Sequence, residues 1–344
     1  MLTPTTSIYS NPVSTRLPLI ALFAGLAVLA ISAISLSIVA GSDGFRPALL
    51  MRWLTGNTDP QTRLIIETLR LPRALSAFGV GGMLALAGVL MQVLLRNPLA
   101  DPYILGTSGG AACGALMALT LGLSVAATNL AAFAGALLST VIVFGFGGFR
   151  HKFSPTALLL TGVVLASGFG AIVSLLLALS PDNSLRGMLF WLMGDFSLSL
   201  TPTTPLALLA LAGIATTVCA RPLDLLAESP DRARILGLPL LSARAAVLAL
   251  ASLLTAYSVT VAGSIGFIGL VVPHLVRHYT GPRHSVLVPA AIIAGGALLC
   301  TADVLSRTVA APRQLPVGTL TAMIGVPLFL YLLRNRYRAG RAQA

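Results

Sequence analysis

Long apolar runs separated by short polar breaks make up most of this chain. A run of about 20 apolar residues is long enough to cross the hydrocarbon core of a bilayer. Ten runs can be traced, at residues 17–40, 74–95, 104–123, 125–146, 156–179, 203–220, 242–262, 265–280, 286–309 and 315–333. The pattern predicts an all-α polytopic membrane protein of about ten transmembrane helices, with the eighth short and broken. Since no long polar linker divides the chain, residues 1–344 are expected to form a single transmembrane domain in the lipid bilayer.

The composition favours the same class of protein. Hydrophobic residues make up 56% of the chain and charged residues only 9%, with a mean hydropathy of +0.92, whereas soluble domains carry about 25% charged residues. The net charge of +12 is typical of nucleic-acid binding, but the arginines are scattered between apolar runs and not gathered on one face. We therefore expect no nucleic-acid partner. The three cysteines lie in or beside apolar runs, which predicts packing roles and no metal site.

The distribution of basic residues predicts the orientation, because cytoplasmic loops carry an excess of lysine and arginine. With the N-terminus in the cytoplasm, 14 of the 22 basic residues fall on the cytoplasmic side. Both termini are therefore expected to be cytoplasmic. The eight outer residues are Arg46, Arg52, Arg63, Arg70, Arg73, Arg186, Arg307 and Arg313. This large number of outer arginines favours an acidic partner outside the membrane.

Glycines mark two further features. Gly106, Gly110 and Gly114 recur every four residues, a spacing that lets helix backbones approach closely, either within one subunit or at a dimer face. The segment 263–269 has three glycines at three-residue spacing, and Pro273 follows it. This pattern predicts a broken helix, which is tolerated where protein or a water-filled cavity satisfies the backbone. Broken helices of this kind often lie near a transport path.

The longest polar interruption, residues 221–244, predicts a short helix outside the membrane. Ser229 can cap the helix, Pro230 suits its first position, and Asp231 complements the positive end of its dipole. Gly237 is typical of a helix end. Because a helix of about two turns is marginal alone in water, it is expected either to rest on the bundle or to fit a groove on a cytoplasmic partner.

Several kinds of chemistry find no support in the sequence. It contains no phosphate-binding loop and no His-Glu-x-x-His motif, so the chain is expected to be no enzyme and to need no cofactor. His274 and His278 are four residues apart and could share a metal or haem, although interfacial histidines are the simpler interpretation. Carboxylates that could relay protons are scarce in the crossings, which disfavours an ion-gradient-driven secondary transporter, the main alternative function. A membrane scaffold without transport activity would not explain the broken glycine segment.

Six blocks of sequence carry a resemblance to a known family. They are RLPRALSAFGVGGMLALAGVLMQVLLRNPLADPYILGTSGGA from residue 70, FWLMGDFS at 190–197, RARILGLPL at 232–240, VAGSIGFIGLVVPHLVR at 261–277, LLCTADVLSRTVAAPRQLPVG at 298–318 and TAMIGVPLFLYLL at 321–333. Taken in their order along residues 17–335, these blocks resemble the FecCD-family permeases, which belong to vitamin B12, haem and iron–siderophore importers. The resemblance implies a type II ABC importer permease in the bacterial inner membrane. Its partners would be a second permease copy, two cytoplasmic ATP-binding subunits and a periplasmic binding protein.

The resemblance also implies a docking site for the binding protein, formed by outer arginines. The matching positions are Arg70, Arg73 and Arg307. Arg73 is expected at the N-terminus of the second crossing, where the helix dipole disfavours a cation. Internal pairing is the open alternative, because Asp303 stands four residues before Arg307 and Glu67 lies within reach of Arg63 or Arg70.

On the cytoplasmic side, the resemblance implies a gate and an ATPase contact. The gate positions are Asn97, Leu99, Ser154 and Thr156. The coupling loop, residues 221–240, would meet the ATP-binding subunits through Asp231, Arg232, Arg234 and Gly237. Pro230 stands where the family often has an acidic residue, and Glu228 or Asp231 can substitute for it. Residues 185–197 resemble a short helix that dips into the pathway between two copies of the fifth crossing.

The substrate is not encoded in these motifs. Permeases for haem, ferric siderophores and cobalamin share all of them. An iron chelate or haem is expected only because such substrates are common in the family.

Overall fold

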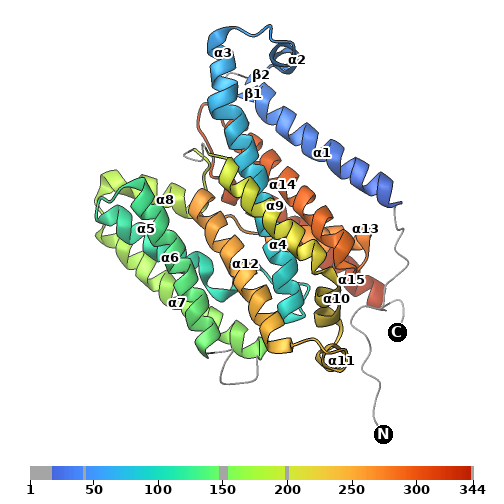
Figure 1. Cartoon of the computed structure of the whole chain (residues 1–344). Coiled ribbons are helices and arrows are strands. Elements are labelled where there is room, and N and C mark those ends of the chain that lie inside the picture. The colour runs from blue at the N-terminus through green and yellow to red at the C-terminus, as the bar shows by residue number, and fades with distance from the viewer. Residues whose placement is uncertain (1–17, 42–43, 147–153, 198–200, 342–344) are drawn as a thin grey trace.

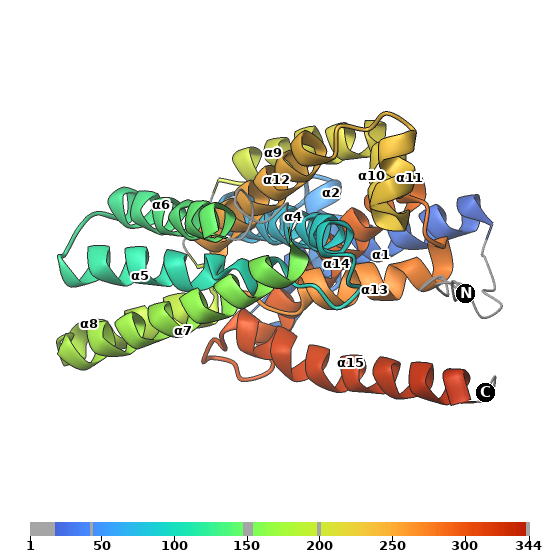
Figure 2. The same ribbon diagram turned by 90° about the horizontal axis from the view of Figure 1, so that it is seen from below.

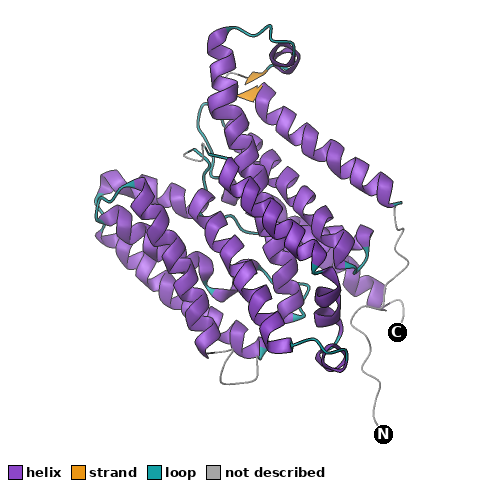
Figure 3. Ribbon diagram, viewed as in Figure 1, coloured by secondary structure: helices purple, strands orange, loops and turns teal. Residues whose placement is uncertain are grey.

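The computed structural model describes residues 18–41, 44–146, 154–197 and 201–341 (Figure 1). Figure 3 shows helices throughout, with one short antiparallel pair of strands, β1 (Ala40–Gly41) and β2 (Gly44–Phe45). Each of the ten predicted runs coincides with a helix, namely α1 (Leu19–Val39), α4 (Leu71–Leu95), α5 (Thr107–Thr120), α6 (Val125–Phe144), α7 (Pro155–Leu179), α9 (Thr203–Val218), α12 (Leu240–Ala262), α13 (Ile268–Thr280), α14 (His284–Thr308) and α15 (Val317–Arg341). The all-α prediction is confirmed.

Not every one of these helices is long enough to span a bilayer alone. Within the described residues, six helices are long and apolar enough to cross a bilayer. The pair α9 and α10 (Ala220–Glu228), bent by 65°, makes a seventh candidate span. Helices α5 and α13 have only 14 and 13 residues. Since a full crossing needs about 20 residues, these two cover part of the bilayer thickness, and loops complete their segments.

Helix α4 forms the centre of the bundle and is longer than predicted. Helix α3 (Pro60–Ile65), a π-helical turn (Ile66–Arg70) and α4 join into one apolar helix from Pro60 to Leu95. Asp59 caps its start by accepting a hydrogen bond of 2.8 Å from the Thr62 amide. The π turn ends two residues before Pro72, which has no amide hydrogen to donate to the normal helical ladder.

The expectation that Arg73 stands at a helix N-terminus is therefore wrong. The helix begins thirteen residues earlier, at Pro60, and Arg73 lies in its interior. The predicted run began only at residue 74, because Glu67, Arg70 and Arg73 interrupt the apolar pattern of the earlier turns. The dipole argument for an external partner of Arg73 does not apply.

Glycines bring the helices of this subunit into close contact. A Cβ atom at Gly88 would overlap the carbonyl of Gly269 on α13, and one at Gly81 would overlap the carbonyl of Gly295 on α14. Likewise, Gly110 on α5 packs against the backbone of Gly135 on α6. Of the two alternatives for the four-residue glycine spacing, packing within one subunit is the one observed for Gly110.

The chain is broken between α12 and α13, as the glycine pattern predicts. Gly263 has a φ of +68°, a conformation that L residues rarely adopt. Protein groups satisfy the broken segment: the Tyr103 hydroxyl accepts a hydrogen bond of 3.3 Å from the Ile265 amide, and the hydroxyls of Ser108 and Ser264 lie 2.5 Å apart. The break therefore lies against α5 and the loop before it.

The bundle has two distinct ends (Figure 1). One end, called here the outer end, carries β1, β2, α2 (Ala48–Leu54) and α3. The opposite end, called the coupling end, carries α10 and α11 (Pro230–Ile235), and α1 begins and α15 ends toward it. Three of the basic residues assigned to the cytoplasm, Arg16, Arg150 and Lys152, lie outside the described residues.

Candidate functional site

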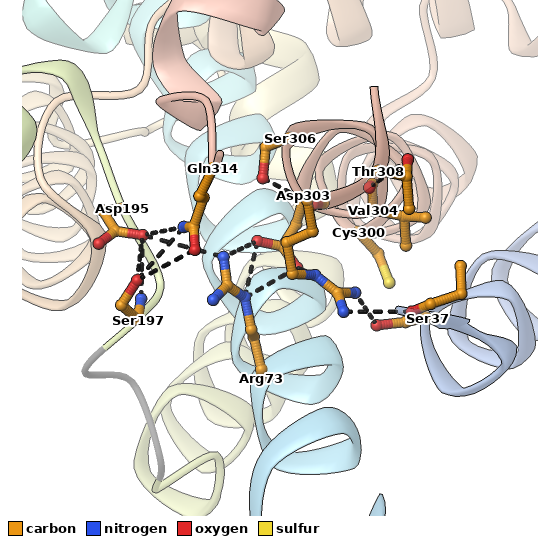
Figure 4. Close-up of polar contacts among 12 residues, drawn as sticks. Ser37, Arg73, Asp195, Ser197, Cys300, Asp303, Val304, Ser306, Thr308 and Gln314 are labelled. Carbon is orange, nitrogen blue, oxygen red and sulfur yellow. Dashed lines mark hydrogen bonds and ion pairs between the residues drawn. The ribbon is translucent and has the colours of Figure 1, made fainter. Parts of the chain in front are cut away.

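A buried carboxylate, that of Asp303 on α14, organises the outer end of the bundle (Figure 4). The side chain of Asp303 is 0% exposed. Its Oδ1 atom accepts hydrogen bonds from Arg73 Nη2 at 2.7 Å and Arg73 Nε at 3.0 Å. Arginine and carboxylate groups in such a forked arrangement form strong, directional ion pairs. This pair connects α14 to α4 across 230 positions of sequence.

Arg307 completes the junction from the same helix as Asp303. Its Nε atom donates to Asp303 Oδ2 at 3.2 Å. Its other nitrogens reach α1 and β1, where Nη2 donates to the Ser37 hydroxyl at 2.9 Å and Nη1 donates to the Ala40 carbonyl at 3.3 Å. One carboxylate thus joins the outer ends of α1, α4 and α14.

A second carboxylate, Asp195, extends this network toward α8 (Asp182–Met193). Arg73 Nη2 lies 3.8 Å from Asp195 Oδ1. The same oxygen accepts hydrogen bonds from Gln314 Nε2 at 2.6 Å and from the Ser197 hydroxyl at 2.8 Å. Within this network, two arginines and two aspartates therefore balance in formal charge.

The three predicted docking residues all bind groups of their own chain, and they differ in how far they are buried. The side chains of Arg73 and Arg307 are only 12% and 13% exposed, and both bind Asp303. Arg70 is half-buried, and its Nη1 atom donates to the Ile38 carbonyl at 2.7 Å. The internal-pairing alternative is therefore observed for Asp303 and Arg307, and Glu67 pairs with Arg63 at 2.9 Å. Docking by these arginines stays a prediction.

The predicted gate residues lie at the coupling end, in two turns. Asn97 follows Arg96, which ends α4 in the left-handed conformation, and Asn97 Oδ1 accepts a hydrogen bond of 2.9 Å from the Leu99 amide. Ser154 caps α7 by accepting a 3.3 Å hydrogen bond from the Ala157 amide, and Thr156 is exposed in the first turn of α7.

The two turns lie on neighbouring elements. The short 3₁₀ helix η2 (Pro102–Leu105) follows the Asn97 turn, and a Cβ atom at Gly162 of α7 would overlap the carbonyl of Ile104. Helix α7 is therefore packed at Gly162 against η2, the element that follows the Asn97 turn.

Helix α11 carries the predicted ATPase-contacting residues and projects from the coupling end. Its C-terminus is a Schellman motif: the Gly237 amide donates to the Arg234 carbonyl at 3.0 Å, and the Leu238 amide donates to the Ala233 carbonyl at 2.9 Å. The φ of +80° at Gly237 suits this ending. Ile235 and Leu236 are 83% and 66% exposed, while Ala233 is buried against the bundle.

The start of α11 differs in one detail from the prediction. The helix begins at Pro230 as expected, but the Ser229 side chain makes no capping hydrogen bond. Ser229 is the single residue between α10 and α11, so the turn between the two helices sets its conformation. Its carbonyl instead accepts the first helical hydrogen bond, from the Ala233 amide at 3.0 Å.

The charged side chains of α11 pair with each other or with the last residue of α10. Arg232 lies 3.3 Å from Glu228, and Arg234 lies 3.8 Å from Asp231. All four side chains are exposed, so these pairs contribute little to stability and remain accessible.

A buried histidine connects α10 to α14 through a contact that sequence analysis did not predict. Asp224 Oδ1 accepts a 2.9 Å hydrogen bond from the His284 amide and lies 2.6 Å from His284 Nδ1. The helix before α11 is thereby attached to α14.

The described residues contain no candidate metal site. Among them, no group of three or more histidine, cysteine, aspartate or glutamate side chains could hold an ion. His274 instead packs edge-on to Phe329 of α15, and His278 packs edge-on to Tyr279.

This arrangement of helices defines a class of protein, the membrane-spanning permeases of type II ABC importers. A solved structure described as an inward-facing, metal-chelate type ABC transporter has a TM-score of 0.79 and 30% identity, over 92% of this chain and 99% of that chain. The chain belongs to the FecCD transport family, whose model matches residues 18–335.

Two relatives with established names are similar over most of their length. The cobalamin import system permease protein BtuC of Halobacterium salinarum is 41% identical over 282 residues, which cover 80% of this chain and 75% of that protein. The vitamin B12 import system permease protein BtuC of Escherichia coli (strain SE11) is 38% identical over 321 residues, or 92% of this chain and 94% of that protein. The chain is thus a multi-pass permease of an ABC importer family.

Proposed function

We propose that the chain is the permease subunit of an ATP-driven importer that carries a large metal chelate from the periplasm to the cytoplasm. The observation that carries the proposal is that the two ends of one bundle present different surfaces. Arginines gather at the outer end, and a short exposed helix with an apolar tip, Ile235–Leu236, projects at the coupling end. The family membership and the solved metal-chelate type neighbour support this function.

Among metal chelates, cobalamin is the substrate that the relatives favour. Two of them are named as permeases for cobalamin or vitamin B12. The earlier expectation of an iron chelate or haem rested only on frequency within the family, so we propose cobalamin in preference to it. Uptake of labelled cobalamin by the assembled importer, with unlabelled haem and ferric siderophore as competitors, tests this choice. Uptake of labelled haem or ferric siderophore, with no uptake of labelled cobalamin, would reverse it.

We further propose that two copies of the chain assemble around the transport path, in the bacterial inner membrane with cytoplasmic termini. Helix α7 supports this idea, because most of its apolar side chains are exposed, including Leu160, Val164 and Leu179. Helix α15 likewise exposes Met323 and Leu330. Both helices lie on the same side of α4 when the bundle is viewed along its length (Figure 2), so a second copy can cover them together.

In this mechanism, helix α4 connects the two functional ends. It carries Arg70 and Arg73 at its outer part and leads into Asn97 and Leu99 at the coupling end. Closure of two ATP-binding subunits would move α11, and the Asp224–His284 contact would pass that movement from α10 to α14. Because α14 binds α4 through Asp303 and Arg73, the helices can tilt together and alternate access between the two sides.

The docking proposal predicts a selective effect of charge at Arg70. Changing Arg70→Glu should raise the dissociation constant for the periplasmic binding protein about tenfold or more, because like charges placed together at an interface cost several kcal/mol. Binding of the purified binding protein to the permease in nanodiscs measures this effect. Arg70 is a cleaner probe than Arg73, whose replacement also disrupts the Asp303 junction.

Arg63→Glu provides the matched control, since Arg63 lies at the same end, is more exposed and undergoes the same change in charge. If the binding protein binds the Arg70→Glu variant, the Arg63→Glu variant and the unmodified chain with equal affinity, Arg70 is not part of the docking site.

A further inference from the structure

An open apolar groove runs along the bundle between α9 and α14, over α4. Its volume is about 620 Å³, and Phe78, Leu209, Gly213, Val218, Pro289 and Ile292 are among its lining residues. The groove lies along α9, which Figure 2 shows on the opposite side of α4 from α15. It therefore faces away from the α7–α15 surface proposed for the second copy and toward surrounding lipid.

Small residues keep the groove open. Gly213 has no side chain, and a Cβ atom there would lie 2.9 Å from Ile292 Cδ1 across the groove. Ala210, one turn earlier, also lines the groove and is exposed. A larger side chain at either position would project into the space between α9 and α14.

The length of the groove matches one leaflet of a bilayer. Its lining on α9 extends from Leu206 to Val218, which is a rise of about 18 Å along a helix axis. Half of the hydrocarbon core of a bilayer is about 15 Å thick. An extended acyl chain that enters from one membrane surface would therefore occupy the groove along most of its length.

Two exposed arginines stand where the groove meets the coupling end. Arg221 follows Val218 by three residues, and Arg283 directly precedes α14. The contact between Asp224 and His284 brings the two segments together. Asp224 lies three residues after Arg221 and accepts hydrogen bonds from His284, the residue that follows Arg283. The carboxylate beside the two arginines is therefore already engaged.

We propose that this groove binds one acyl chain of an anionic phospholipid from the leaflet at the coupling end, with the lipid phosphate between Arg221 and Arg283. Arginine matches the geometry of a phosphate group and binds it strongly. The bound lipid would fill the space between α9 and α14 beside the α10–α14 contact. This inference does not depend on the substrate or on the direction of transport.

Native mass spectrometry of the purified full-length permease tests the proposal, with phosphatidylglycerol and phosphatidylcholine of identical acyl chains added to the micelles. Each basic residue near a membrane surface contributes about fivefold to the binding of anionic lipid, so phosphatidylglycerol should bind about 25-fold more tightly. An Arg221→Gln and Arg283→Gln double variant should bind both lipids equally. An Arg232→Gln and Arg234→Gln variant, with the same loss of charge at the same end, should keep the preference.

A second pair of variants tests the groove itself. Gly213→Leu should lower the binding of both lipids at least tenfold, whereas Gly25→Leu, where a side chain would enter open space on α1, should have no effect. Ala210→Leu replaces Gly213→Leu if the latter does not fold. The proposal is overturned if the groove variant binds lipid as the Gly25→Leu variant does, or if the Arg221 and Arg283 double variant keeps its preference for phosphatidylglycerol.

Discussion

Replacing Asp303 with alanine should lower the free energy of unfolding by about 3–5 kcal/mol, because removing one partner of a buried ion pair leaves uncompensated charge. Asp303 is the shared acceptor for Arg73 and Arg307, both of which are nearly covered. Its loss would leave two cations beside each other at the junction of α1, α4 and α14. Denaturant unfolding of the purified variant in mixed micelles measures the change.

Glu67→Ala is the control for this experiment. Glu67 also forms an ion pair with an arginine at the outer end, but that pair is exposed, and exposed pairs contribute about 0–1 kcal/mol. If the Asp303→Ala variant is as stable as the Glu67→Ala variant, the buried junction does not hold the three helices together.

The change Ile235→Asp should weaken assembly with the ATP-binding subunits by about 30-fold or more. Ile235 is the most exposed apolar residue of α11, and truncating or charging a buried interface anchor typically costs 2 kcal/mol or more. Because Ile235 makes few contacts within the chain, the thermal stability of the isolated permease should not change. Co-purification of the ATP-binding subunits at several concentrations measures the loss.

A control for α11 comes from the opposite end of the bundle. Leu54→Asp changes a comparably exposed leucine on α2, and it should leave ATPase assembly unaffected. Assembly of the Ile235→Asp variant at the level of the Leu54→Asp variant would contradict the role of α11 as the coupling helix.

The membrane crossings could be predicted from sequence because their signal is local. Each apolar run lies on a helix, and the glycines at 263–269 indicate a break that the structure contains. The end of α11 at Gly237 was also predictable, since a left-handed glycine after a helix has few alternatives.

Helices with weak apolar patterns were missed for the opposite reason. Helices α2, α3 and α10 have between six and nine residues and mix polar with apolar positions. Helices this short are marginal on their own, so their sequences indicate them only weakly. Helix α10 buries Ala220, Leu223 and Leu226 in the bundle, and α3 continues directly into the long central helix. The same limit led to the incorrect start of the helix that contains Arg73, because α3 was not recognised as its first turn.

The polar network of the outer end was predictable only in part. The pair Asp303 and Arg307 could be inferred from a separation of four residues, whereas Arg73 reaches Asp303 across 230 positions. A signal was available, because Asp303 is a carboxylate within an apolar helix, and such residues usually have a specific partner. Asp224 and His284 carried no comparable signal, since both lie beside polar loops.

The central claim, ATP-driven import, is tested most directly by uptake into proteoliposomes that contain the permease with and without the ATP-binding subunits. The binding protein and labelled cobalamin are supplied outside the vesicles, and ATP is supplied inside. Uptake should require both the ATP-binding subunits and ATP, and an imposed proton or sodium gradient should not replace them. Uptake by the permease alone, driven by such a gradient, would contradict the account and favour a secondary transporter.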